Sequence, residues 1–196
     1  CSDYGVKING TVEVDFPALM DRMKRIRADI SNHDAVKNFT DHYGVDVFLG
    51  HGSFKNKNTV VVNGQELTFS KACIATGGRP LVPDYPGVDK IKYYNSDNIW
   101  NLTEFPKKML VVGSGPIGSE LGQGFARIGT EVTMLERGKQ FLPRDDPDGV
   151  ALLADQMAKD GVKMLFETAP QEFAPVEGSE KVLVTLKKNN GEVVEP

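Results

Sequence analysis

The chain has 196 residues, of which 40% are hydrophobic, and its formal net charge is −4. This length and apolar content allow a buried core in one or two domains. A mildly acidic chain lacks the basic surface typical of nucleic-acid binding, and no apolar run approaches the roughly 18 residues needed to cross a bilayer. We therefore expect neither a nucleic-acid partner nor a membrane partner.

Helical and extended patterns alternate in the first third of the chain. Apolar residues recur with helical spacing over residues 16–39, which predicts one long helix with a charged outer face. Short apolar runs predict a buried strand at residues 44–50 and, within residues 71–78, a second apolar strand that runs into a glycine turn. Between these runs, Asn63-Gly64 separates two apolar segments and is a strong signal for a type I′ hairpin.

The two cysteines, Cys1 and Cys73, form no local redox or metal-binding motif, and no metal site is predicted. Cys73 lies in the apolar run 71–78, where we expect a buried, unreactive thiol. The next segment, residues 79–87, contains three prolines and predicts a linker or a domain edge. Beyond it, we expect one helical turn at about residues 97–102.

From about Pro106 onward, strands and helices alternate. The pattern predicts strands at 109–112, 131–136 and 162–166, helices at 116–128 and 147–160, and a closing hairpin over 181–195 that turns at Asn190-Gly191. Such alternation is typical of a parallel, right-handed β-α-β-α-β unit. The predicted class is therefore α/β, with a parallel sheet followed by a β-hairpin meander.

A glycine motif follows the strand 109–112 and opens the next helix. Gly113 permits a tight turn, Gly115 lets the backbone approach a pyrophosphate, and Gly118 allows the helix to pack close to the strand. Pro116 suits the first helical turn, since its missing N–H would have no partner inside the helix. Because the helix N-terminus attracts anions, the motif predicts a Rossmann-like dinucleotide site.

Glu136 ends the second strand of this unit, at the position where an acid can accept the hydroxyls of an adenosine ribose. A carboxylate there would repel a 2′-phosphate, which favours NAD, or FAD, over NADP. Arg137 and Lys139 are the counter-argument, because either could offset a phosphate charge if turned inward. The predicted NAD site comprises Gly113, Gly115, Pro116, Ile117, Gly118, Glu136 and Arg137.

Glu120 lies inside the glycine-motif helix, two residues after Gly118. One interpretation is an acid that is favoured near the positive end of the helix. The other is an acid that faces the bound nicotinamide, which makes Glu120 the candidate catalytic residue.

The run KACIATGGRP, the proline-rich linker and the run LVVGSGPIGSELGQGFARIGTEVTMLER together resemble the middle of a class I pyridine nucleotide-disulfide oxidoreductase. The likeness covers essentially the whole chain and is closest to the mercuric reductase and dihydrolipoamide dehydrogenase branch. It implies a partial FAD-binding domain at 1–105 and an NAD-binding domain at 106–196 whose last strand is cut off. It also implies an FAD-dependent enzyme that is a homodimer at full length.

The resemblance also assigns residues. It implies that Glu120 is the acid near the nicotinamide and flavin, and that the FAD lies near His51, Gly52, Ala75, Thr76, Gly77 and Gly78. The family's first glycine motif, its CxxxxC pair and its C-terminal His-Glu pair have no counterpart in this sequence. We therefore expect an internal fragment, inactive alone, of an enzyme of the cytoplasm or an organelle matrix.

Three functions stay open at this point. The first is a fragment of a flavoenzyme that takes hydride from NADH and passes electrons through FAD to a small-molecule, disulfide or metal-ion substrate. The second is a nucleotide-binding module without catalysis. The third is a parent enzyme that needs no cysteine pair, like NADH oxidases or ferredoxin reductases.

Overall fold

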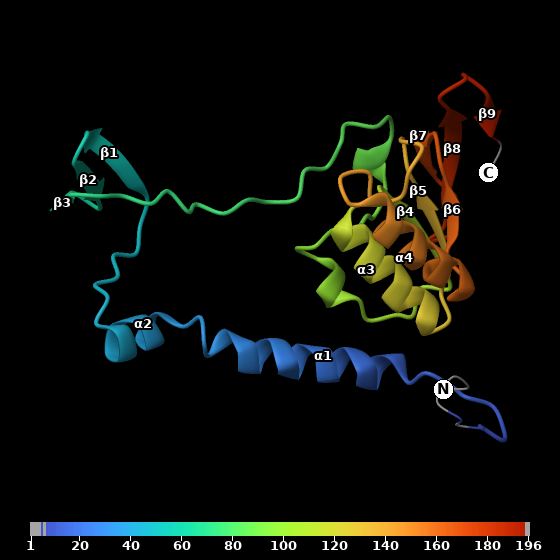
Figure 1. The fold of residues 1–196 in the computed structure, drawn as a ribbon, viewed down its shortest axis with the longest axis horizontal. Coiled ribbons are helices and arrows are strands. Elements are labelled where there is room, and N and C mark those ends of the chain that lie inside the picture. The colour runs from blue at the N-terminus through green and yellow to red at the C-terminus, as the bar shows by residue number, and fades with distance from the viewer. Residues whose placement is uncertain (1–4, 6, 195–196) are drawn as a thin grey trace. The chain divides into compact units, whose positions relative to one another are not determined.

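The computed structural model describes residue 5 and residues 7–194 (Figure 1). The chain separates into two compact units, Ala18–Arg79 and a second unit that joins Cys1–Pro17 to Pro80–Pro196. The change from one unit to the other at Arg79 and Pro80 falls inside the segment predicted as a linker. Among the described residues, no helix is both long and apolar enough to cross a membrane. Cys1 lies outside the described residues.

Two helices replace the single helix predicted over residues 16–39, so that prediction is wrong. The helix α1 (Phe16–Ser31) ends in a turn, and α2 (Val36–Tyr43) follows it. Ser31 donates to the carbonyl of Ala28 at 2.7 Å. Polar side chains of this kind compete with helical hydrogen bonds, and Ser, Asn, His and Asp occupy residues 31–34 in succession, which explains the break.

The unit Ala18–Arg79 contains one antiparallel sheet. Its strands are β1 (Gly52–Asn56), β2 (Thr59–Val62) and β3 (Gln65–Thr68), in the order β1-β2-β3. Asn63 and Gly64 join β2 to β3 with φ of 49° and 80°. Positive φ at both central residues is the type I′ geometry, so the predicted hairpin is confirmed.

The strands predicted at 44–50 and 71–78 do not form, and both predictions are wrong. A strand needs a neighbour for its backbone N–H and C=O groups, and neither segment pairs with any strand among the described residues. Cys73 is consequently exposed rather than buried.

The second unit contains the parallel sheet that the sequence predicts. Its strands are β4 (Lys108–Val112), β5 (Glu131–Leu135) and β6 (Lys163–Leu165), in the order β4-β5-β6, and the helices α3 (Pro116–Arg127) and α4 (Pro147–Lys159) connect them. The Asp146 carboxylate caps α4 by accepting from the backbone N–H of Asp148 at 3.0 Å. The predicted α/β class is thus confirmed.

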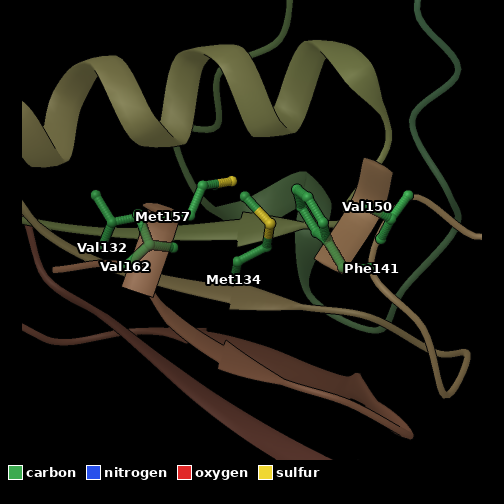
Figure 2. Packing of buried hydrophobic residues seen from close by; sticks show 6 residues of the cluster. All are labelled: Val132, Met134, Phe141, Val150, Met157 and Val162. Atoms are coloured by element: carbon green, nitrogen blue, oxygen red, sulfur yellow. The ribbon is translucent and has the colours of Figure 1, made fainter. Parts of the chain in front are cut away.

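The core of this unit lies between the parallel sheet and its helices (Figure 2). It consists of side chains from β5, α4 and the loops beside them: Val132, Met134, Phe141, Val150, Met157 and Val162. Met157 is fully buried and Met134 is 1% exposed. Full burial of side chains of this size contributes about 1.5–3 kcal/mol each, so this cluster fixes the strand ends that carry the glycine loop.

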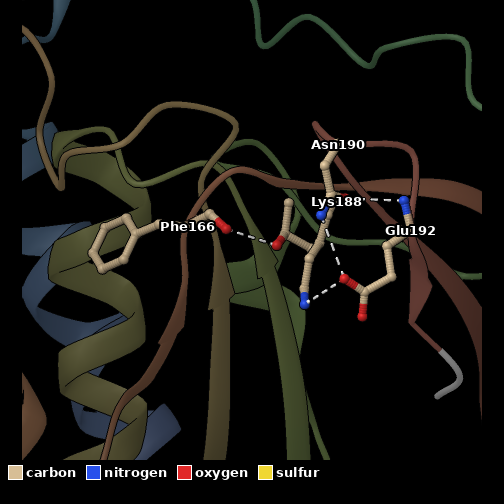
Figure 3. Close-up of polar contacts among 5 residues, drawn as sticks. Phe166, Lys188, Asn190 and Glu192 are labelled. Atoms are coloured by element: carbon tan, nitrogen blue, oxygen red, sulfur yellow. Dashed lines mark hydrogen bonds and ion pairs between the residues drawn. The ribbon is translucent and has the colours of Figure 1, made fainter.

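An antiparallel sheet follows, made of β7 (Thr168–Pro175), β8 (Val182–Lys188) and β9 (Val193–Val194). The closing hairpin is confirmed, with Gly191 at φ of 90° in its turn. Figure 3 shows the turn, where Lys188 pairs with Glu192 at 3.0 Å. The sequence did not predict β7, because its two prolines disfavour a strand, and a bulge interrupts its pairing with β8.

Two short 3-10 helices, η2 (Val88–Lys90) and η3 (Ile99–Asn101), precede the parallel sheet, and η3 confirms the predicted turn.

Asp160 connects α3 to the end of α4. Its carboxylate accepts from the Gln123 amide at 2.7 Å, from Arg127 Nε at 2.9 Å and from the Gln156 amide at 3.0 Å. Burial alone would raise the pKa of Asp160, but these donors outweigh it and lower the pKa. A negative charge at a helix C-terminus is otherwise unfavourable, so the donors stabilise the packing of the two helices.

We expect Asp160→Asn to lower the Tm by a few degrees at neutral pH. Because the folded-state pKa is depressed, the stabilisation by the carboxylate is present above the pKa of an unfolded aspartate and is lost as the pH falls through the folded value. The difference in Tm between the variant and the parent chain should therefore vanish in acid. Thermal melts across pH measure this, with the exposed Asp155 of the same helix changed to Asn as the control. An equal loss of Tm at acid and neutral pH would contradict the account.

Candidate nucleotide-binding site

The glycine loop lies at the carboxyl edge of the parallel sheet. In the register of β4 and β5, Val112 is opposite Leu135, so Gly113 and Glu136 are the next residues along two neighbouring strands. Gly113 has φ of 99°, a conformation that side chains disfavour, and its N–H donates to the Leu135 carbonyl at 2.9 Å. Two residues that lie far apart in the sequence are thereby brought together at one edge of the sheet.

The first turn of α3 approaches the loop closely. A Cβ built on Gly118 would lie 2.6 Å from the Gly113 carbonyl oxygen, so only glycine fits this contact. A Cβ on Gly115 would instead meet nothing within 4 Å. Pro116 begins the helix, no side chain caps it, and Ile117 is 56% exposed. The helix therefore presents its N-terminal N–H groups and partial positive charge to an open surface.

The Glu136 carboxylate is held by donors from two loops. Oε2 accepts from the Ser114 hydroxyl at 2.6 Å and from the Ser114 N–H at 3.2 Å. Oε1 accepts from the Gly138 N–H at 2.6 Å. The side chain is half-buried and points at the glycine loop instead of solvent. This arrangement is a preformed anionic acceptor beside a helix N-terminus.

These contacts keep Glu136 ionised. Partial burial alone would raise the pKa of the carboxyl, but hydrogen bonds from Ser114 and Gly138, together with the nearby Arg137 charge, lower it below its usual value. Because the folded-state pKa is depressed, the ionised carboxylate contributes stability above the unfolded pKa of about 4.3. That contribution is lost as the pH falls through the folded-state pKa.

Sequence reasoning missed the serines of the motif. Ser114 is 1% exposed, and its carbonyl accepts from the Ser119 hydroxyl at 3.2 Å. Ser119 also donates to the Gly115 carbonyl at 2.9 Å. A small hydroxyl residue between the first two glycines, opposite an acid at the end of the neighbouring strand, is the signal that could have identified Ser114.

The structure places the remaining predicted residues of this unit on the surface. Arg137 follows Glu136 and is exposed, and Glu120 is exposed on the second turn of α3. No hydrogen bond joins either side chain to the glycine loop among the described residues. Their roles in binding and catalysis stay predictions.

The predicted flavin residues lie in the other unit. His51 and Gly52 are exposed at the start of β1, and Ala75, Thr76, Gly77 and Gly78 form an exposed segment without regular structure. Gly77 has φ of 69°, which is the conformation of a glycine turn. Their contact with FAD stays a prediction. Among the residues described, no group of His, Cys, Asp and Glu side chains could hold a metal ion.

Comparison with known proteins agrees with this geometry. Residues 9–195 match the family described as pyridine nucleotide-disulphide oxidoreductase. A mercuric reductase from Bacillus cereus is 34% identical over 152 residues, which are 78% of this chain and 24% of that protein. A dihydrolipoyl dehydrogenase from Acholeplasma laidlawii is 34% identical over 167 residues, 83% of this chain and 49% of that protein.

A solved structure gives the same result. The HOCl-induced flavoprotein disulfide reductase RclA from Escherichia coli has a TM-score of 0.74 and 28% identity, covering 93% of this chain and 41% of that one. The chain thus spans less than half the length of each of these three proteins. The resemblance drawn from the sequence is confirmed. The chain belongs to the pyridine nucleotide-disulphide oxidoreductase family, whose members depend on FAD and NAD(P).

Proposed function

We propose that this chain is an internal part of a flavoenzyme and contributes its NADH-binding site. The parent enzyme takes hydride from NADH and passes electrons through FAD to a small-molecule, disulfide or metal-ion substrate. The observation that carries the proposal is the Glu136 carboxylate, ionised and fixed by Ser114 and Gly138 beside an open helix N-terminus.

The phosphates fit the first turn of α3. The space beside Gly115 is open, so a pyrophosphate can approach the backbone. The uncapped helix N-terminus offers N–H donors and about half a unit of positive charge. Anions bind readily where these two features coincide. We therefore assign Gly113, Gly115, Pro116, Ile117 and Gly118 to the pyrophosphate.

The adenosine ribose fits Glu136. A carboxylate offers roughly four lone-pair positions, and the donors from Ser114 and Gly138 occupy three of them. The remaining position on Oε1 can accept one ribose hydroxyl. A 2′-phosphate at this place would meet a fixed negative charge, which supports NADH over NADPH. Arg137 would weaken this preference if its guanidinium turned inward.

When bound, NADH supplies the hydride, and the residues of this chain orient it. Glu120 lies on the second turn of α3, beyond the turn assigned to the pyrophosphate. By its resemblance to the family acid, we assign Glu120 to the nicotinamide end of the site. Its alternative role, an acid favoured by the helix dipole, would contribute only a few tenths of a kcal/mol to stability.

We also propose that the unit Ala18–Arg79 contributes to FAD binding. The proposed contacts are His51, Gly52, Ala75, Thr76, Gly77 and Gly78. Glycine has no Cβ, so a cofactor can approach its backbone closely where the surrounding space is open. A Cβ built on Gly77 or Gly78 would meet nothing within 4 Å. The parent enzyme is proposed to be a homodimer.

A nucleotide-binding module without catalysis is the second candidate. The observation that favours it is the thiol content, since the described residues hold Cys73 as their one free cysteine and place no second thiol beside it. A cysteine-independent flavoenzyme would share this feature. The reading frame upstream of Cys1 separates the candidates, because a CxxxxC pair about forty residues before it supports the disulfide enzyme.

We expect the isolated chain to bind NADH weakly and to purify with little or no FAD. Calorimetric titration with NADH tests the first half, and the absorbance of the purified chain in the visible range tests the second. A heat of binding that saturates supports the site at Glu136. A yellow chain with bound flavin would contradict the second expectation, and no binding at millimolar NADH would contradict the first.

A further inference from the structure

A chain of hydrogen bonds connects the closing hairpin to the proposed ribose site. Asn189, in the turn between β8 and β9, donates from its side-chain amide to the Arg137 carbonyl at 3.0 Å across 52 positions of sequence. The Gly138 N–H, the next donor along that backbone, donates to Glu136 Oε1 at 2.6 Å. The carbonyl that Asn189 holds and the N–H that Glu136 accepts belong to the same peptide group.

Because the two groups share one peptide, the hydrogen bond from Asn189 to the Arg137 carbonyl also orients the Gly138 N–H. The chain contains no cis peptide bond among its described residues, so the Arg137 C=O and the Gly138 N–H point in opposite directions. Fixing the carbonyl toward Asn189 therefore fixes the N–H toward Glu136. A flip of this peptide would turn the carbonyl oxygen toward the carboxylate, where two acceptors repel each other.

Glu167 reinforces the connection on the backbone. Its N–H donates to the Gly138 carbonyl at 2.9 Å, and its own carbonyl accepts from the Asn189 N–H at 2.8 Å. Glu167 has φ of 51°, a left-handed conformation that costs a non-glycine residue free energy. Such a conformation persists where surrounding contacts determine it, and here both backbone groups of Glu167 are engaged.

We propose that Asn189 is a positioning residue for the nucleotide site, which holds the peptide between Arg137 and Gly138 so that Glu136 stays aimed at the adenosine ribose. The proposal rests on the proposed function for its consequence in nucleotide preference. The geometry itself involves only residues of this chain. The Asn189 side chain acts through the carbonyl of this peptide group.

The neighbouring Asn190 provides a matched control. Its side chain accepts from the Glu192 N–H at 3.0 Å and lies 3.5 Å from Glu192 Oε2 (Figure 3). These contacts stay inside the turn and do not reach the segment after β5. Asn189 and Asn190 are both exposed, so their replacement removes a similar side chain from the same turn.

The experiment follows the Gly138 amide of the full chain by nitrogen-edited NMR across pH, without nucleotide. The groups that face Glu136 are Ser114, Gly138 and the charge of Arg137, while Lys139 pairs with Glu167 at 4.0 Å further along the segment. Alanine and leucine at position 189 add no charge to this set. The chemical shift of the Gly138 amide changes with pH as Glu136 ionises. In Asn189→Ala and Asn189→Leu, the midpoint of this change should lie at a higher pH than in the parent chain. Ser114→Ala is the positive control, and Asn190→Ala should leave the midpoint unchanged.

The second readout is the ratio of NADPH to NADH dissociation constants. Asn189→Ala should weaken NADH binding by about two- to tenfold, as expected for one hydrogen bond. The ratio of the NADPH to the NADH dissociation constant should therefore fall. A change in Tm without a change in midpoint or ratio would overturn the proposal, because a purely structural contact predicts that result. An unchanged midpoint in both Asn189 variants would overturn it as well.

The two readouts separate this proposal from the function on which it rests. If the midpoint rises in the Asn189 variants while the parent chain binds no NADH, the positioning by Asn189 holds and the proposed function fails. If Glu136→Ala abolishes the preference for NADH while the Asn189 variants match the parent chain, the proposed function holds and the positioning role fails.

Discussion

Replacing Glu136 with alanine should weaken NADH binding by about ten- to a hundredfold, because one charge-assisted hydrogen bond to the ribose contributes roughly 1.5–3 kcal/mol. NADPH binding should weaken less or improve. The substitution removes the carboxylate that repels a 2′-phosphate and leaves the Ser114 hydroxyl and the Gly138 N–H as donors. Ser114 is 1% exposed, so a phosphate oxygen would give this buried donor a new partner.

Calorimetric titration with both nucleotides measures the change in preference. The control is Glu131→Ala at the other end of β5, where the exposed carboxylate pairs with Lys108 at 3.1 Å. Exposed pairs contribute little, so this variant should bind like the parent chain. An unchanged ratio of NADPH to NADH affinity in Glu136→Ala would contradict the ribose assignment.

Replacing Gly118 with alanine should destabilise the second unit by about 1–3 kcal/mol, which is the usual cost of an overpacked contact. The added Cβ would lie 2.6 Å from the Gly113 carbonyl oxygen and 3.2 Å from Val111 Cγ1. A backbone oxygen cannot move aside as a flexible side chain can, so the helix and the glycine loop must separate. NADH binding should be lost with the loop geometry.

Gly124 of the same helix is the matched control for this substitution. A Cβ there would meet nothing within 4 Å. Alanine in a helix interior is favoured over glycine by about 1 kcal/mol, so Gly124→Ala should keep or raise the free energy of unfolding. Denaturant titration of both variants compares them directly. Equal stability of Gly118→Ala and Gly124→Ala would contradict the packing that we describe around the glycine loop.

The strands and helices around the glycine loop of the second unit were predicted correctly because the local sequence signals there agree with one another. The glycines, Pro116 and the apolar strand ahead of them each favour the same strand-turn-helix structure, and packing of β5 and α4 reinforces it. The type I′ hairpin at Asn63-Gly64 was predictable for the same reason, since its geometry depends on two residues. These elements could be predicted from the sequence because their local preferences agree with the fold.

Other elements depend on partners that the sequence does not display. The apolar runs 44–50 and 71–78 read as strands, yet a strand forms only beside a neighbour that satisfies its backbone. The strand β7 shows the opposite case, because its pairing with β8 outweighs the preferences of its two prolines. Local propensity could not decide any of these segments.

The residues of the site likewise fall into those that the sequence identified and those that it did not. The glycine motif and Glu136 were identifiable because their spacing is fixed by one strand-helix-strand unit. The donors that orient Glu136 were not identified, because Ser114 lies 22 positions away and Asn189 lies 52 positions from the carbonyl that it holds. Only the folded chain brings such residues together.

The most direct test of the proposed site is a titration of the labelled chain with NADH, followed by nitrogen-edited NMR. We expect the largest shifts at the amides of Gly115, Ile117, Gly118 and Gly138, which surround the helix N-terminus and the Glu136 carboxylate. The same titration of Glu136→Ala should require a higher NADH concentration to produce these shifts. Saturable shifts confined to the unit Ala18–Arg79, or no shifts at the glycine loop, would contradict the account.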